Sequence, residues 1–188
     1  MPITKLTFHP ATPARWPDVE ELFGERGACG GCWCMTWRLP RAKFLANQGP
    51  TNKRSFRKIV RSGAQPGVLA YADGKPVGWC AVAPRSEFSF LDRSRVLAPV
   101  DDQPVWSVTC FFVAKEWRRR GLSVKLLKAA VAFAGKRGAK IVEGYPQEPR
   151  MKLPGAFVWT GLASAFRKAG FTVAARRSKL RPIMRLEL

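Results

Sequence analysis

The sequence predicts a single α/β domain, residues 1–188, in which strands alternate with helices. An apolar run at Val105–Val113 is followed by a basic turn and then, from Gly121, by apolar residues at helical steps. Two further apolar runs flank Asp73 and Gly74, a pair that predicts an antiparallel hairpin. A chain of 188 residues with 46% hydrophobic residues is long enough to bury one substantial core.

The elements before the central strand follow from apolar spacing. Alternating or continuous apolar runs predict strands, and apolar residues at three- and four-residue steps, such as Trp16, Val19 and Leu22, predict helices. Glycines and prolines mark the boundaries between these segments. In chain order we expect a strand at 3–8, helices at 14–24 and 52–62, strands at 68–72 and 76–83, and a long polar loop at 84–103.

The second half of the chain continues this alternation of helices and strands. The central helix has stop signals at Gly135 and Gly138, and Gly170 ends a second helical pattern. In chain order we expect a helix from 122 to about 134, a strand at 139–145, a proline-rich mobile connection at 146–156, a helix at 159–169, and strands at 171–175 and 183–188.

The chain is strongly basic, with 33 Lys and Arg residues against 13 Asp and Glu residues and a formal net charge of +20. Nucleic acid is one partner that fits this excess, although the sequence contains no recognisable nucleic-acid-binding motif. The other interpretation is a charged surface that keeps the protein soluble. The predicted helix at 14–24 carries Asp18, Glu20, Glu21 and Glu25, which form either a solvated face or a local acidic cleft.

No membrane segment is expected. No uninterrupted apolar stretch approaches the ~20 residues that a spanning helix needs. The first residues, MPITKLTFHP, lack the apolar centre of a signal peptide. We therefore expect a cytoplasmic protein.

Three of the five cysteines, Cys29, Cys32 and Cys34, lie within six residues of one another. Structural zinc sites usually have four protein ligands, and the other two cysteines, Cys80 and Cys110, lie in apolar runs that predict core strands. We therefore expect no metal site. A reduced, partly buried loop is favoured over a metal-binding or redox module.

The segment 114–123, AKEWRRRGLS, predicts an anion-binding site between a strand and a helix. The first turn of a helix has backbone N–H groups without partners and the positive end of the helix dipole. Three arginines stand beside this turn. Gly121 permits either a positive φ or the close approach of a phosphate.

Arg118, Gly121 and Ser123 follow a spacing that resembles the acyl-CoA signature of the GNAT superfamily of N-acyltransferases: Arg or Gln, two residues, Gly, one residue, then Gly or Ala. Ser123 departs mildly from this signature and is small enough to be tolerated. The resemblance implies that the turn holds the CoA pyrophosphate, and that backbone N–H groups near the end of the strand polarise the thioester carbonyl. It assigns to acetyl-CoA the residues Phe112, Val113, Arg118, Arg119, Arg120, Gly121, Leu122 and Ser123.

The resemblance covers nearly the whole chain, because the expected order of elements is that of the GNAT fold. It implies an α/β fold with a mixed, mostly antiparallel central sheet flanked by helices. Residues 166–171 are similar to the superfamily's late helix-to-strand element. The Cys-Trp-Cys loop at 32–34, with 143–146 and 181–184, is similar to a bacterial subgroup. At the position where the superfamily commonly has a tyrosine that protonates the departing thiolate, this chain has Phe166, which has no proton to give.

Glu143 and Tyr145 are the candidate catalytic residues. The acceptor amine must lose a proton, and Glu143 is the only acid on its predicted strand, where burial would make it a better proton acceptor. Glu87 is the second candidate, and either carboxylate can instead be an ordinary surface charge. Tyr145 is the candidate general acid. The alternatives are protonation by water and a structural role for Tyr145.

These observations together predict an N-acetyltransferase that moves an acetyl group directly from acetyl-CoA to a primary amine of a small molecule or peptide. Because the positive charge repels polycations, we expect a neutral, zwitterionic or acidic acceptor. Two alternatives are a nucleic-acid-binding protein on the same scaffold and a metal or thiol interaction module at Cys29, Cys32 and Cys34. A homodimer is compatible with each of them.

Overall fold

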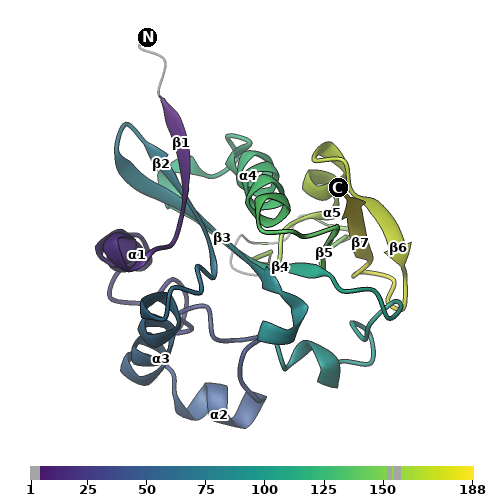
Figure 1. Ribbon diagram of the computed structural model, residues 1–188, viewed down its shortest axis with the longest axis horizontal. Helices are drawn as coiled ribbons and strands as arrows, with labels where there is room; N and C mark the ends of the chain where they lie inside the picture. The colour runs from purple at the N-terminus through teal and green to yellow at the C-terminus, as the bar shows by residue number, and fades with distance from the viewer. Residues whose placement is uncertain (1–4, 152–153, 155–157) are drawn as a thin grey trace.

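The computed structural model describes residues 5–151, 154 and 158–188, and within them the chain forms a seven-stranded sheet flanked by helices (Figure 1). The strands are β1 (Leu6–Pro10), β2 (Gly67–Ala72), β3 (Lys75–Pro84), β4 (Trp106–Val113), β5 (Ile141–Gly144), β6 (Thr172–Ala175) and β7 (Ile183–Glu187). The helices are α1 (Trp16–Phe23), α2 (Arg41–Ala46), α3 (Pro50–Arg61), α4 (Leu122–Lys136) and α5 (Ala163–Lys168).

The strand order is β1-β2-β3-β4-β5-β7-β6. Every neighbouring pair is antiparallel except β4 and β5, which are parallel. Helix α4 occupies the connection between these two parallel strands, as a crossover requires. The predicted fold class, a mixed and mostly antiparallel sheet with flanking helices, is confirmed.

The order of elements matches the expected order, with one added helix and several shifted boundaries, of which the start of α5 is shifted most. The short helix α2 is not predicted from the sequence. The helix expected at 159–169 begins only at Ala163, because Gly161 has a φ of +87° and Leu162 is extended. The expected strand at 3–8 and the expected connection at 146–156 lie partly outside the described residues.

The predicted hairpin between β2 and β3 turns at Asp73 and Gly74. Both residues have positive φ, +48° and +84°, as a type I′ turn requires. This turn pairs Ala72 with Lys75, and after a register shift between Tyr71 and Ala70, Val68 pairs with Cys80.

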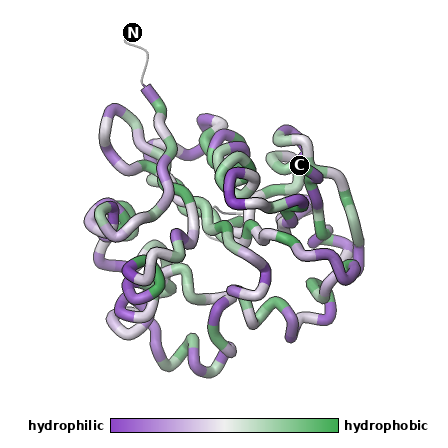
Figure 2. Tube along the Cα trace, viewed as in Figure 1, coloured by the Kyte–Doolittle hydropathy of each residue, from purple (hydrophilic) through white to green (hydrophobic). Residues whose placement is uncertain are grey.

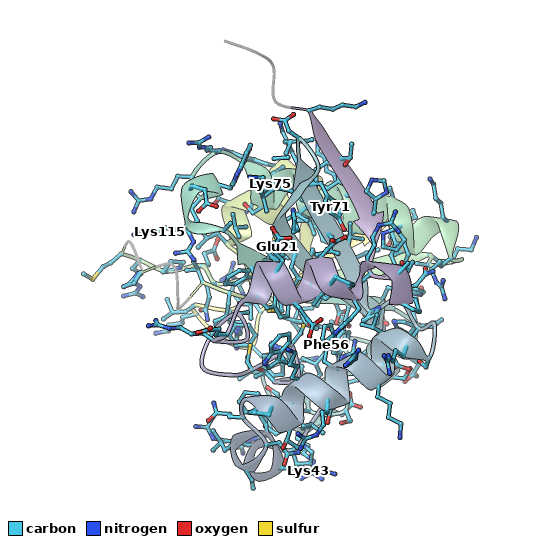
Figure 3. The ribbon with its side chains drawn as sticks, turned by 90° about the vertical axis from the view of Figure 1, so that its left-hand side faces the viewer. Glu21, Lys43, Phe56, Tyr71, Lys75 and Lys115 are labelled. Carbon is cyan, nitrogen blue, oxygen red and sulfur yellow. The ribbon has the colours of Figure 1, made fainter. Side chains whose placement is uncertain are left out.

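Two buried layers lie on opposite faces of the sheet. On one face, α4 buries Leu122, Leu126 and Leu127 against the central strands, and α5 adds Phe166. On the other face, α1 and α3 cover Trp79, and Phe56 lies between the two helices (Figure 3). Hydrophobic residues are concentrated on the central strands, and hydrophilic residues alternate with them on the helices (Figure 2).

A third buried cluster forms where the loop at 85–103 folds over the end of the sheet. Phe88, Leu91 and Leu97 of this loop are buried together with Trp37 and Tyr145. The long loop is therefore an ordered part of the core. In the described part of the chain, no helix has the length and apolar character that a membrane crossing requires.

Gly144 on β5 provides a test of the packing between the sheet and α5. A Cβ at this position would overlap the ring of Phe166, which is fully buried and has no free space into which to move. We predict that Gly144→Ala lowers the free energy of unfolding by about 1–3 kcal/mol, the usual cost of overpacking a core. Chemical denaturation measures this change.

Gly135→Ala on α4 is the matched control. Its added methyl group meets only Leu188, whose side chain is 51% exposed and can move aside. Alanine also favours the helix, so this variant should be neutral or slightly more stable. Equal stability of the two variants would contradict the packing described here.

Candidate active site

Strands β4 and β5 run side by side for only three residues. Trp106, Ser107 and Val108 pair with residues 142–144, and no later residue of β4 pairs with β5. Thr109 is an extra residue in β4, because Val108 and Cys110 pair with consecutive residues of β3. Such a bulge bends a strand. From Thr109 onward, the edge of β4 that faces β5 is therefore open.

The backbone N–H groups of β4 alternate between β3 and this open edge. Ala114 donates to the carbonyl of Val77 at 3.0 Å, so the alternation of the antiparallel ladder also directs the N–H of Phe112 toward β3. Phe111 faces the open edge, where its N–H donates to the carbonyl of Trp159 at 2.6 Å. Of the two backbone donors predicted for the thioester carbonyl, Val113 faces the open edge and Phe112 does not.

The turn after β4 presents a row of free backbone donors. Among the described residues, none of the five backbone N–H groups from Arg119 to Ser123 has a hydrogen-bond partner. Val124 is the first residue of α4 whose N–H is bonded, to the carbonyl of Gly121 at 3.2 Å. Positive φ angles at Arg119, +62°, and Gly121, +74°, curve the backbone into this row. Such concave rows of N–H groups at a helix start bind anions.

The side chains of the turn support the same chemistry. Arg118 donates from Nε to the carbonyl of Val113 at 2.9 Å, which fixes the turn to the end of β4. The guanidinium of Arg120 lies 5.3 Å from the ring of Trp117, and Arg119 and Arg120 are exposed. A Cβ at Gly121 would meet nothing within 4 Å, so glycine is required here by its positive φ. The turn fits a phosphate or pyrophosphate group.

Glu143 is fully buried and held by three side chains. Its Oε1 accepts hydrogen bonds from Tyr145 at 2.7 Å and from Arg85 at 3.3 Å. Its Oε2 accepts from Nε of Arg185 at 2.7 Å. An acceptor amine has no access to either oxygen unless an ion pair breaks. This geometry does not favour the predicted role of Glu143 as the base.

The two arginines extend the network outward to the loop at 85–103. Arg85 also binds Asp92 at 3.1 Å and the carbonyl of Leu97 at 2.8 Å. Arg185 binds both oxygens of Asp101, at 2.6 and 3.1 Å, and these hydrogen bonds lower the pKa of Asp101. The buried carboxylate of Glu143 therefore ties this loop to β5 and β7.

The other predicted catalytic residues have different surroundings. The hydroxyl of Tyr145 accepts from Arg85 at 2.7 Å and lies 2.8 Å from Oγ of Ser107. Burial and the charge of Glu143 raise the pKa of Tyr145 well above its usual range, so the phenol stays protonated near neutral pH. Glu87 is half-exposed and pairs with Arg38 at 3.3 Å.

Phe166, which the resemblance sets at the position of a tyrosine, is part of the core. Its ring is fully buried and makes edge contacts with Phe111, at 6.1 Å between centroids, and with Phe171, at 5.0 Å. It therefore fills space beside β4.

The cysteine loop enters the second buried layer. Cys29 is exposed, whereas Cys34 is buried and accepts a hydrogen bond from Nε1 of Trp79 at 3.4 Å. The thiol of Cys110, remote in sequence, lowers the pKa of Cys34. Across the part of the chain that the structure describes, no three His, Cys, Asp or Glu side chains gather as metal ligands.

The sequence analysis did not identify Arg85 or Arg185 as partners of Glu143. One signal was available for Arg185: it interrupts a short apolar strand, and a guanidinium buried there needs a carboxylate. The register of β5 against β7, in which Glu143 pairs with Arg185, supplies that carboxylate.

Comparison with known proteins gives one family. The family model described as "Acetyltransferase (GNAT) family" matches residues 33–152, well over half of the chain. Among curated protein sequences, none matches.

Solved structures with the same fold share little sequence with this chain. The structure of yncA from Salmonella typhimurium, with its cofactor acetyl-CoA, has a TM-score of 0.57 and 16% identity and covers 97% of this chain and 94% of its own. The PaiA N-acetyltransferase of Thermoplasma acidophilum, in complex with coenzyme A, has a TM-score of 0.55 and 14% identity. The match covers 98% of this chain and 99% of the PaiA chain. A GNAT-family acetyltransferase from Streptococcus pneumoniae has a TM-score of 0.54 and 16% identity. The match covers 98% of this chain and 99% of the pneumococcal chain.

The Glu143 network predicts that this carboxylate is needed for stability. Glu143→Gln removes the negative charge between Arg85 and Arg185, whose side chains are only 11% exposed. Because two buried guanidinium groups then lose their counter-charge, we expect the free energy of unfolding to fall by about 3–5 kcal/mol. Chemical denaturation of the purified variant measures this.

Glu148→Gln is the matched control, since Glu148 also bridges two arginines, Arg167 and Arg176, but at the surface. Surface pairs contribute little, so we expect a change within about 1 kcal/mol. If Glu143→Gln is as stable as the unmodified protein but loses turnover, Glu143 is the general base and the structural assignment is wrong.

Proposed function

The chain belongs to the acetyltransferase (GNAT) family, and we propose that it transfers the acetyl group of acetyl-CoA directly to a primary amine of a small molecule or peptide. When bound, acetyl-CoA supplies the acetyl group, which forms an amide with the acceptor while the thiol of CoA leaves. The observation that carries this proposal is the row of five free N–H groups from Arg119 to Ser123, placed at the end of an open strand edge.

The turn at 118–123 binds the pyrophosphate of the donor. Its free N–H groups donate to the phosphate oxygens, and the exposed guanidinium groups of Arg119 and Arg120 add positive charge. Arg118 acts mainly through its hydrogen bond to Val113, which holds the turn in place. The solved complexes of yncA with acetyl-CoA and of PaiA with coenzyme A support a CoA ligand for this fold.

The open edge of β4 binds the amide-containing arm of the donor as an added strand would. The N–H of Val113 faces this edge and donates to the acyl-CoA. Phe112 helps to hold β4 in place, because its ring packs against that of Phe23 with 5.8 Å between centroids. The ring of Phe166 contacts that of Phe111 and so fills the space next to this residue of β4.

Glu143 and Tyr145 act as positioning residues in this proposal. Glu143 holds Arg85, Arg185 and the hydroxyl of Tyr145, and it thereby fixes the loop beside the transfer site. The proton of Tyr145 is donated to Glu143, so we assign protonation of the leaving thiolate to water. Water also takes the proton that the acceptor amine loses.

Binding of CoA tests the donor assignment. A ligand present at about 100 times its Kd stabilises a protein by about 2.7 kcal/mol, which for this chain length raises Tm by about 5–10 °C. We predict such a rise with CoA, and we predict that Gly121→Glu abolishes it. The added carboxylate repels phosphate and a side chain at a positive φ strains the turn.

Gly138→Glu controls for strain and charge. Gly138 also has a positive φ, +88°, and a Cβ there also meets nothing within 4 Å, but the residue follows the other end of α4. This variant should keep the full rise in Tm with CoA. No rise for the unmodified protein at millimolar CoA would refute the proposed function.

A further inference from the structure

Buried N–H donors without partners gather around the third core cluster. Seven buried side-chain atoms have no hydrogen-bond partner among the described residues, and five of them belong to this region. Each such atom costs about 1–3 kcal/mol unless a partner satisfies it. The five atoms are Nε1 of Trp37, Nε and Nη2 of Arg38, Nε of Arg85 and Nε of Arg181. All five are donors, which favours a ligand rich in acceptor oxygens.

Arg38 is the best-defined of these groups. Its side chain is only 4% exposed, and Nη1 donates to the carbonyl and to Oε2 of Glu87, both at 3.3 Å. Its guanidinium lies 4.5 Å from the ring of Phe88, which fixes its plane. The two unpartnered atoms, Nε and Nη2, form one edge of the guanidinium. Two parallel N–H groups on such an edge match the two oxygens of a carboxylate.

Arg181, just before β7, is a second arginine with a buried unpartnered donor: its Nε is buried, although the residue as a whole is partly exposed. It lies 5.8 Å from the ring of Trp37 and donates from Nη2 to Thr160 at 3.2 Å. No carboxylate among the described residues forms an ion pair with it, and burial lowers its pKa. A partly buried cation without a counter-charge loses hydration, and a bound anion would supply that charge.

The backbone that carries these donors is fixed by the neighbouring loop. The N–H of Phe90 donates to the carbonyl of Trp37 at 3.0 Å, and Ser89 donates from its hydroxyl to the carbonyl of Arg38 at 3.2 Å. The ring of Trp37 also packs against Phe90, with 6.0 Å between centroids. Donors held in this way lose little freedom when a ligand binds.

The same group of residues adjoins the open edge of β4. The ring of Trp159 lies 5.9 Å from that of Trp37, and its carbonyl accepts the hydrogen bond from Phe111. Cys34, four residues before Arg38, belongs to the buried cluster against which Cys110 of β4 packs. A ligand held by Arg38 and Arg181 is therefore a neighbour of the proposed acyl-CoA arm.

We propose that the acceptor amine carries a carboxylate, as a free amino acid does, and that Arg38 and Arg181 bind this carboxylate beside Trp37. The proposal rests on the proposed function. In the reaction the amine nitrogen forms an amide bond to the acetyl carbon, the carbon–sulfur bond of the thioester breaks, and the amine proton passes to water. The net charge of +20 repels polycationic amines over long distances but does not repel a zwitterionic or acidic acceptor of this kind.

The test compares each amino acid with its α-carboxamide, which keeps the amine and loses the negative charge. Thiol release is measured at saturating acetyl-CoA, with an acceptor-free blank that accounts for the five native cysteines. A hydrogen-bonded charge is worth about 10- to 150-fold in affinity, so at least one amino acid should exceed its amide in kcat/KM by this factor. O-phosphoethanolamine is included as a phosphate-bearing amine.

Arg38→Gln assigns this selectivity to one residue. The variant should raise KM for the amino acid and change the rate with the amide little, so that the ratio of the two falls toward one. A merely structural role for Arg38 would slow both acceptors equally and leave the ratio unchanged. Arg177→Gln is the control: Arg177 is an exposed arginine that binds the carbonyls of Ala98 and Pro99, and this variant should keep the ratio.

Each outcome decides between the claims. The carboxylate assignment is overturned if amides match amino acids, if Arg38→Gln keeps the ratio, if no amino acid is acetylated while CoA still raises Tm, or if O-phosphoethanolamine is preferred. The absence of any rise in Tm with CoA would instead refute the proposed function, and the acceptor assignment with it.

Discussion

The separation of β4 from β5 after Val108 is the constraint on which the rest of the site depends. If the two strands stayed paired, the N–H of Val113 would be used within the sheet and no edge would remain for a ligand. The bulge at Thr109 starts the separation, and the carbonyl of Trp159 satisfies the N–H of Phe111 on the exposed side. The turn with five free N–H groups then follows directly from the end of the open strand.

A second constraint is the buried charge at the base of this opening. Glu143 lies on the parallel strand next to β4, and its ion pairs with Arg85 and Arg185 reach the long loop at 85–103. Buried ion pairs rarely add stability compared with apolar residues, but they tolerate the loss of a partner poorly. The network therefore fixes the position of the loop that carries Phe88, against which Arg38 is stacked.

Most of the fold was predictable because local patterns agree with what the tertiary structure needs. The spacing around Gly121 also predicted the geometry of the turn, since both the positive φ and the helix start are local features. The helix at 159–169 was predicted too long, because Gly161 leaves the helical conformation. The surroundings of Glu143 were not predictable, since its partners Arg85 and Arg185 are distant in sequence. Strand register brings Arg185 to Glu143, and the start of the loop at 85–103 brings Arg85.

The most direct measurement of the central claim is the response of individual backbone amides to CoA, followed by NMR spectra of the ¹⁵N-labelled protein. The account predicts that the amide signals of Arg119 to Ser123 and of Val113 shift on addition of CoA and exchange more slowly with solvent, because these free donors gain acceptors. The signal of Gly138 should stay unchanged. Shifts confined to the basic helices α2 and α3, with the turn unaffected, would contradict the account.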